Sequence, residues 1–384
     1  MITFQYISLH FLLLVVLIFF CRKISDARDD SKYWFYARFP IIAFTLEEGL
    51  RWGRETDWSL YYNVYQVFLR GDWTNHEPLF QVIWKIFAWC HCSYPVVISF
   101  SSFLFIFSVF VFFKPYRNVV WVAIPLCVGN HLIAASNTIR WYMAISMILI
   151  ALTIIKQKKM YLGVGLLLAS FLIHYGIIVL IPIFFLASRV KCVAKPKWAI
   201  LTCVLLIFLF DDSVLSNFSF LFNLFKNVER FSGYFNYGME GLFNHAQEQK
   251  TIFATLFTFI PYFAFILYGY HLKRDNKISC FLYNMIVLAS YIKLVSVNLE
   301  LFVRYYNAVD FFVCLVAGYV FIYLRNNCYR TQHVIFILFI VFYILRKFLY
   351  MMHPYDYEEY MMYVWNNNLM DPNAITAFRS RLGR

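Results

Sequence analysis

The sequence predicts an all-α membrane protein, a polytopic bundle of about twelve transmembrane helices. Hydrophobic residues make up 62% of its 384 residues and aromatic residues 22%, whereas charged residues make up only 14%. A soluble domain carries about 25% charged residues, and a single core could not bury so much apolar surface. The apolar runs at residues 11–20, 201–210 and 334–343 are continuous and do not alternate, which favours helices over the strands of a barrel.

Apolar segments follow one another along the whole chain, and each predicts one helix. The first, at residues 3–21, has no basic segment before it and no small-residue cleavage site after it, so we interpret it as a span. Together the segments predict a single polytopic membrane domain over residues 1–384. The predicted spans lie near residues 3–21, 36–50, 94–113, 118–134, 141–155, 160–173, 176–189, 197–211, 251–271, 279–297, 305–324 and 332–350.

The lysines and arginines predict the orientation, because cytoplasmic loops are enriched in both. If the N-terminus is outside and the spans alternate, every inside loop carries at least two of them. The net charge of +13 therefore needs no nucleic-acid partner, and most acidic residues fall on the outer side. The inside residues are Arg22, Lys23, Arg28, Lys32, Lys114, Arg117, Lys156, Lys158, Lys159, Arg189, Lys191, Lys195, Lys197, Lys273, Arg274, Lys277, Arg325 and Arg330.

Three long segments are predicted to lie on the extracytoplasmic side: residues 51–93, residues 212–250 and the tail 351–384. Within the first, residues 79–89 are apolar but carry Gln81 and Lys85, and they are too short for a comfortable span. We expect them to form an amphipathic helix on the outer membrane surface. A span at this place would invert the topology downstream and break the charge rule.

Two carboxylates in the first outer segment are candidates for acid–base chemistry. Asp57 is followed by Tyr61 and Tyr65 at intervals of four residues, so the three share one helix face, and Glu77 precedes Pro78. Glycosyl chemistry often uses such a pair of carboxylates, with aromatic rings as stacking surfaces for sugars. Each acid also has a structural role open to it, because Asp57 could cap the following helix and Glu77 could begin the next one.

Further candidates lie at predicted outer ends of spans, where ionisable residues indicate function. Arg140 opens a span with no acid nearby in sequence, and its guanidinium suits a phosphate, although it could instead reach lipid headgroups. His174, at the tip of a tight hairpin, could transfer protons or serve as a hydrogen-bonded tip residue. Glu300 and Arg304 are four residues apart and could bind substrate or simply pair with each other.

In this order, these features resemble the EpsG family, Wzy-like polymerases of bacterial exopolysaccharide and capsule. The resemblance covers nearly the whole chain, and one position departs from it, since Glu55 stands where the family usually has the glycine of Gly-Thr-Asp. The matching features are Asp57 with Tyr61, Glu77 before Leu79-Phe80, Arg140 opening a span, Phe171-x-x-His174 before Pro182, and Arg304-Tyr305.

The resemblance implies a membrane glycosyltransferase of the bacterial inner (cytoplasmic) membrane. Such a polymerase transfers a growing glycan from its undecaprenyl-pyrophosphate carrier to the next lipid-linked repeat unit at the outer face. The implied partners are the undecaprenyl-pyrophosphate-linked oligosaccharide, membrane lipids, and the flippase and chain-length regulator of the same pathway. No nucleotide sugar is required, which agrees with the absence of a glycine-rich nucleotide fingerprint.

In this hypothesis, Asp57 or Glu77 accepts the proton of the acceptor hydroxyl, with His174 as the alternative base. Arg140 and Arg304 hold the pyrophosphate and stabilise the leaving group. We expect Arg140, His174 and Arg304 to converge beneath the loop that bears both acids. The other predicted substrate-binding residues are Arg51, Arg54, Tyr61, Glu300 and Tyr305.

Two other functions fit part of the pattern. A membrane glycosyltransferase that uses a polyprenyl-phosphate sugar would also place an acid in the first outer loop and an amphipathic helix after it. A lipid-linked oligosaccharide flippase or other transporter would place charges near the midplane of spans, where Lys293 is the main example here. No cofactor or metal is expected, because Cys90, His91 and Cys92 lack a second pair of ligands nearby.

Overall fold

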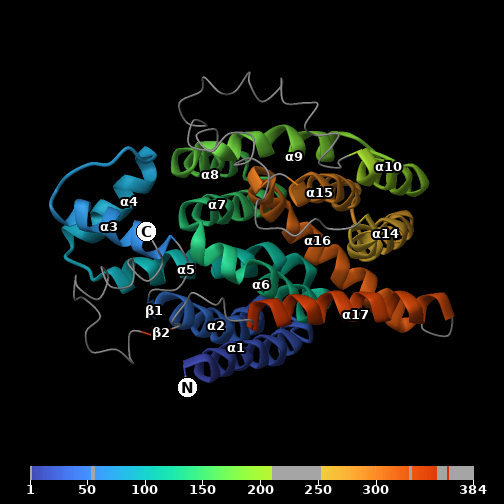
Figure 1. The fold of residues 1–384 in the computed structure, drawn as a ribbon, viewed down its shortest axis with the longest axis horizontal. Coiled ribbons are helices and arrows are strands. Elements are labelled where there is room, and N and C mark those ends of the chain that lie inside the picture. The colour runs from blue at the N-terminus through green and yellow to red at the C-terminus, as the bar shows by residue number, and fades with distance from the viewer. Residues whose placement is uncertain are drawn as a thin grey trace. The chain divides into compact units, whose positions relative to one another are not determined.

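The computed structural model describes residues 2–52, 57–209, 252–298, 300–327, 331–352 and 361–362. Almost all of them are helical, which confirms the predicted all-α class. The helices in Figure 1 are α1 (Ile2–Ser25), α2 (Asp30–Gly49), α3 (Trp58–Leu69), α4 (Pro78–Trp89), α5 (Tyr94–Phe113), α6 (Val120–Asn137), α7 (Ile139–Lys156), α8 (Met160–Ile173), α9 (Leu180–Arg189), α10 (Pro196–Leu209), α14 (Ile252–Arg274), α15 (Cys280–Asn298), α16 (Glu300–Asn326) and α17 (Thr331–Met352).

Local sequence explains where several helices begin. The Asp29 carboxylate caps α2 by accepting the backbone N–H of Lys32 at 2.7 Å. Proline stands in the first turn of both α4 and α5, where its missing N–H costs no helical hydrogen bond. Two 3₁₀ helices, η1 (Lys114–Val119) and η2 (Tyr175–Val179), precede α6 and α9.

Each predicted span coincides with helical structure, but not every helix is long enough to cross a membrane by itself. Among the described residues, six stretches are long and apolar enough, and one of these, Tyr94–Asn137, holds both α5 and α6. Helices such as α8 fall short of the roughly 20 residues that a bilayer needs. The chain therefore has several candidate spans, and the count of twelve stays a prediction.

Helix packing divides the chain into two compact units, and the single membrane domain stays a prediction. The first unit holds the described parts of Met1–Ile178 and Ile344–Arg384, and the second is Val179–Tyr343. Helices that follow closely in sequence pack mostly with one another, because short connections keep neighbours adjacent.

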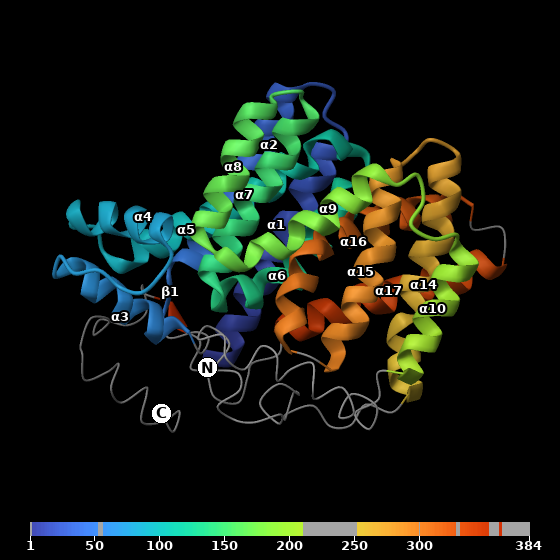
Figure 2. The ribbon, with the colours of Figure 1, turned by 90° about the horizontal axis from the view of Figure 1, so that it is seen from above.

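In the first unit, α1 packs against α2 and α6, α5 packs against α2 and α7, and α7 packs against α8. Figures 1 and 2 show this bundle, with α3 and α4 lying side by side at one end of it. Glycine permits the close contact of α2 with α5, because a Cβ at Gly49 would lie 2.0 Å from Ser99 Oγ. Phe105 of α5 meets Tyr142 of α7 edge to face, with ring centroids 5.2 Å apart.

In the second unit, α15 packs against α9, α14 and α16, and α14 also contacts α10. The Asn284 side chain of α15 holds the connection between α9 and α10. Its Nδ2 donates to the Ala187 carbonyl at 2.9 Å, and its Oδ1 accepts the Val193 backbone N–H at 3.0 Å. A single buried amide thus satisfies polar backbone groups where two helices meet.

Basic connections meet at one end of the first unit. Lys114 Nζ lies 2.6 Å from Asp30 Oδ2, and Arg117 bonds to the same carboxylate. Arg117 also reaches the Ala27 carbonyl at 3.5 Å. The connection before α2 and the connection between α5 and α6 therefore lie on the same side, as alternating spans require.

A short strand pair joins the first outer segment to the tail. Strand β1 (Arg51–Trp52) pairs antiparallel with β2 (Met361–Met362), and Arg51 lies opposite Met362. This part of the tail therefore lies beside the segment that the sequence assigned to the same side. Residues 53–56 and 212–250, within the two predicted outer segments, lie outside the described residues.

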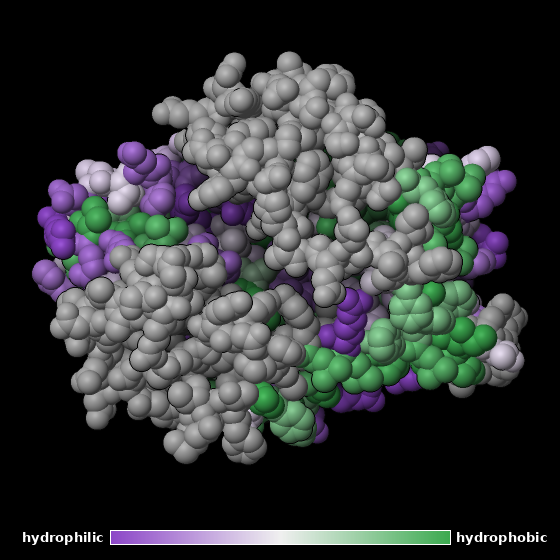
Figure 3. All heavy atoms as spheres, in the orientation of Figure 1, coloured by the Kyte–Doolittle hydropathy of each residue, from purple (hydrophilic) through white to green (hydrophobic). Residues whose placement is uncertain are grey.

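Large apolar side chains remain exposed in stripes, as expected where lipid is the neighbour. Figure 3 shows hydrophobic residues along α17 in the orientation of Figure 1. A stripe at helical spacing marks a face that no described helix covers. On α17 it comprises Val334, Ile335, Leu338, Phe342, Leu345 and Leu349.

Candidate functional site

Arg140 and Glu77, both predicted site residues, form an ion pair although they are 63 positions apart. Arg140 is the second residue of α7, and Glu77 immediately precedes α4. Arg140 Nη1 lies 2.6 Å from Glu77 Oε2, and the two side chains are 23% and 10% exposed. Glu77 makes no side-chain capping bond to α4, so its carboxylate is directed to the arginine and not to the helix that it starts.

One donor of the Arg140 guanidinium makes no hydrogen bond to the described residues. Its Nε is buried, and no acceptor within the described ranges bonds to it. The Phe80 ring lies beside it, with the centroid 5.7 Å from the guanidinium carbon. The Tyr61 hydroxyl accepts the backbone N–H of Arg140 at 3.5 Å, at the long limit of a hydrogen bond.

The electrostatics of this pair keep Glu77 ionised. Burial alone would raise the pKa of Glu77, but the positive charge of Arg140, together with hydrogen bonds to the carboxylate, holds that pKa below its usual value. Burial lowers the pKa of the adjacent His76 to about 4, and the charge of Arg140 acts in the same direction. At neutral pH the loop before α4 therefore presents a carboxylate and an uncharged imidazole.

His174 directly follows α8 in the first unit, and a positive charge on its imidazole would act on the pKa of Glu77 in the same direction as Arg140. The Gly176 backbone N–H donates to His174 Nδ1 at 3.1 Å. An N–H group can only donate, so a neutral His174 carries its proton on Nε2. The Trp141 ring meets the imidazole edge to face at 5.0 Å and fixes its plane.

Asp57 lies at the start of α3 without using its side chain as a cap. Its backbone N–H donates to Asn137 Oδ1 at 3.0 Å. Asn137 is the last residue of α6, three positions before Arg140. The first outer segment is thus anchored to the turn between α6 and α7, from which Arg140 projects.

Arg51, also predicted to bind substrate, is only 2% exposed and makes internal bonds. Its guanidinium donates to the Glu48 carbonyl at 2.5 Å and to the Ser136 carbonyl at 3.1 Å, and its Nη1 lies 3.5 Å from Glu48 Oε2. The Ser136 hydroxyl donates to Glu48 Oε2 at 2.5 Å. This cluster fastens the end of α2 to the end of α6, beside a cavity with room for about one water molecule.

The aromatic residues of α3 and α4 are used mainly in packing. Trp58 stacks on Tyr62 with ring centroids 5.5 Å apart, and the Tyr65 hydroxyl donates to the Cys92 carbonyl at 2.6 Å. Trp89 at the end of α4 and Trp73 in the connection between the two helices stay outside this packing, since they are 82% and 62% exposed. Fewer aromatic rings are therefore available to contact a sugar or a lipid than the number of aromatic residues suggests.

The remaining predicted site residues lie elsewhere. Arg54 lies outside the described residues, as does the side chain of Glu300, which begins α16. Arg304 and Tyr305 belong to α16 of the second unit, where the Tyr305 ring contacts Phe302 at 5.9 Å. The expected convergence of Arg304 with Arg140 stays a prediction.

Several buried ionisable residues were not singled out from the sequence. His10, Glu47 and Glu48 meet between α1 and α2. In the second unit, the Asp310 carboxylate accepts the Tyr306 hydroxyl in the middle of α16. One sequence signal could have found these residues, because each is a polar residue inside an apolar segment. In a membrane protein such a residue is by default a candidate for function.

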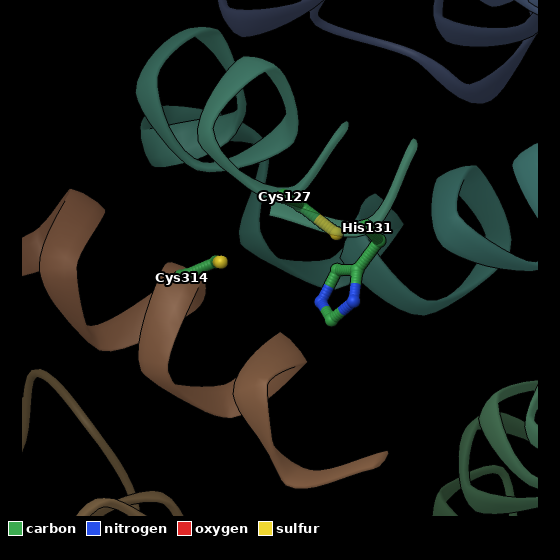
Figure 4. Close-up of side chains that lie close together, drawn as sticks. All are labelled: Cys127, His131 and Cys314. Carbon is green, nitrogen blue, oxygen red and sulfur yellow. The ribbon is translucent and has the colours of Figure 1, made fainter. Parts of the chain in front are cut away.

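Figure 4 shows Cys127 and His131 on α6, one helical turn apart. His131 Nδ1 lies 2.9 Å from the Tyr142 hydroxyl, so this imidazole joins α6 to α7. Cys314, the third labelled residue, belongs to the second unit. Within the first unit, His131 therefore serves the packing of α6 against α7.

These features define a polytopic helical membrane protein whose first unit gathers charged residues from several helices at one end. The chain matches the EpsG family over residues 32–365, and it belongs to that family. The resemblance drawn from the sequence is thereby confirmed. No curated protein and no solved structure matches the chain.

Proposed function

We propose that this chain is a polysaccharide polymerase of the bacterial inner membrane. It transfers a growing glycan from its undecaprenyl-pyrophosphate carrier to the next lipid-linked repeat unit at the outer face. Membership of the EpsG family supports this reaction class. The single observation that carries the site is the ion pair of Arg140 and Glu77, with His174 beside it.

In the proposed reaction, the acceptor hydroxyl attacks the anomeric carbon of the growing glycan. The bond from that carbon to the pyrophosphate oxygen breaks, and undecaprenyl pyrophosphate leaves with the electron pair. Arg140 is suited to the leaving group because its side chain is 23% exposed and its planar fork matches phosphate oxygens. A pyrophosphate bound there competes with Glu77 for the guanidinium and frees the carboxylate.

The proton of the attacking hydroxyl then passes to Glu77 or to Asp57. Glu77 is the stronger candidate, because its lowered pKa keeps it ionised and the incoming pyrophosphate releases it. We assign His174 to donation and not to proton abstraction, since its Nδ1 already accepts the Gly176 N–H. Its Nε2–H is the group that can bond to a phosphate or sugar oxygen.

The other predicted residues take supporting roles in this proposal. Arg51 holds the end of α2 against the α6–α7 turn and so acts as a positioning residue for Arg140. Tyr61 supports the first turn of α7. Arg54, Glu300, Arg304 and Tyr305 remain proposed contacts for the pyrophosphate and the glycan.

The proposal includes the topology of about twelve spans with an extracytoplasmic N-terminus. Helix α4 would then lie on the outer membrane surface, and its exposed Val82, Ile86 and Trp89 on one face support contact with lipid. The lipid-linked oligosaccharide is the substrate. The flippase and the chain-length regulator of the same pathway are the proposed protein partners.

Analysis of lipid-linked products in cells that lack the protein tests this function. A polymerase predicts lipid-linked or surface glycans of one repeat unit, with polymer restored by the intact gene. A repeat unit that lacks one sugar would indicate the polyprenyl-phosphate-sugar transferase instead. Complete units trapped in the inner leaflet would indicate a flippase, and unchanged polymer length without a paralogue would exclude all three.

A further inference from the structure

We propose that His10, Glu47 and Glu48 bind one divalent transition-metal cation, such as Zn²⁺, between α1 and α2. His10 comes from α1, and the two adjacent glutamates come from the last turn of α2. The site is separate from the Arg140–Glu77 pair, and it does not depend on the proposed function.

The three side chains converge in a protected place. One possible ligand atom from each lies within 4.8 Å of the other two, and His10 Nδ1 lies 2.7 Å from Glu47 Oε1. Ligand atoms bonded to one Zn²⁺ at roughly 2.1 Å are at most about 4.2 Å apart, so a small side-chain rotation completes the set. The residues are only 1%, 7% and 2% exposed, in the order His10, Glu47, Glu48.

Charge balance favours a cation at this place. Two neighbouring carboxylates are buried here, and the Arg51 guanidinium, 3.5 Å from Glu48, offsets one of them. Glu47 lies against the imidazole of His10, which offsets its charge only when it is protonated, and a buried carboxylate beside a neutral imidazole would be costly. A divalent ion held by both glutamates removes that cost.

The contact of His10 with Glu47 brings an imidazole nitrogen and a carboxylate oxygen to one place. His10 Nδ1 lies 2.7 Å from Glu47 Oε1, which is the distance of a hydrogen bond or an ion pair. A bound cation would replace this contact. Rotation of the two side chains would then open the distance to the roughly 3.4 Å that separates neighbouring ligand atoms in a tetrahedral Zn²⁺ site.

The ligand types and their support indicate which ion fits. A nitrogen from imidazole with carboxylate oxygens suits Zn²⁺ and similar transition metals, whereas Mg²⁺ and Ca²⁺ prefer oxygen alone. Glu48 is oriented from outside the site by the Ser136 hydroxyl at 2.5 Å and by Arg51, as metal-binding carboxylates usually are. Coordination would join α1 to α2 and stabilise the bundle against unfolding.

The test measures the metal content of the purified full chain in detergent. The protein is stripped with EDTA, desalted, incubated with Zn²⁺ or Mg²⁺, desalted again, and analysed by plasma mass spectrometry. We expect about one Zn²⁺ per chain, no retained Mg²⁺, and a Tm several degrees above that of the stripped protein. His10→Ala and Glu47→Gln should each retain at least tenfold less Zn²⁺.

His271→Ala is the matched control, because His271 is an exposed histidine of the second unit, and it should retain as much Zn²⁺ as the wild type. Zinc-edge X-ray absorption of the wild type should show nitrogen and oxygen neighbours, so the test does not depend on variants that fold. Sulfur neighbours would assign the ion to cysteines and overturn the site. Wild-type protein that retains no Zn²⁺, or folded variants that retain it fully, would overturn it as well.

Discussion

Arg140 Nη1 lies 2.6 Å from Glu77 Oε2, which joins the first turn of α7 to the start of α4. The contact links the bundle of the first unit to the helical pair in the first outer segment. It also gives the proposed site a resting state, in which the acid occupies the place that an anionic substrate would take.

Substitutions at this pair should reduce polymer formation by about 10²-fold, the usual effect of losing one transition-state donor. Arg140→Lys keeps the charge but loses the planar fork, and Glu77→Gln keeps the shape but loses the base. The assay follows conversion of purified lipid-linked repeat units on gels. Arg70→Lys and Asp72→Asn are matched controls, because both are exposed residues of the same outer segment. Equal activity of Arg140→Lys and Arg70→Lys would contradict the role of Arg140.

Gly176→Ala should displace His174 and lower activity several-fold. A Cβ at this position would lie 3.1 Å from both Cε1 and Nδ1 of His174 and 3.3 Å from Trp141 Cζ3, so the imidazole must move. Gly165→Ala is the control, because its Cβ would meet nothing within 4 Å. Alanine should slightly favour α8 at that position. Wild-type activity of Gly176→Ala would show that the present orientation of His174 is not needed.

His76 should make the protein less stable as the pH falls from about 6.5 to about 4. Burial lowers its folded-state pKa to about 4, so in this range the unfolded chain binds the proton more readily than the folded chain. Between pH 7 and pH 5, the Tm of His76→Gln should therefore fall less than that of the wild type. This interval avoids Glu77, whose lowered pKa makes its contribution disappear only at more acidic pH. His271→Gln is the control, and equal slopes for His76→Gln and wild type would refute the prediction.

Removing Arg51 should cost more stability than removing both members of its pair. Arg51→Met leaves the buried Glu48 carboxylate without this partner, a loss of about 3–5 kcal/mol for a broken buried pair. The double variant Glu48→Gln/Arg51→Met should recover part of that loss. Thermal unfolding in EDTA measures both variants without any contribution from bound metal. A double variant no more stable than Arg51→Met would argue against a coupled pair.

Helix positions could be predicted closely from the sequence. α5 (Tyr94–Phe113) and α8 (Met160–Ile173) have the ends expected from apolar runs at 94–113 and 160–173. Apolar runs, prolines and flanking charges are local signals, and a helix satisfies its own backbone hydrogen bonds within the segment. The number of spans was harder to predict from the sequence. Short helices such as α8 are as apolar as a span but do not reach the length needed to cross a bilayer.

The sequence by itself determined the class of this protein, because an excess of apolar residues over charges excludes a soluble core whatever the packing. It also identified Arg140 as a candidate, since an ionisable residue at the end of a span indicates function, and Glu77 as one of two carboxylates in the first outer segment. Only the tertiary structure decided that the two pair with each other, and that Arg51 is buried against Glu48 and Ser136. The contacts of Arg140 with Glu77 and of Arg51 with Ser136 join elements far apart in the chain, and their geometry depends on how helix faces pack, which no local pattern of residues specifies.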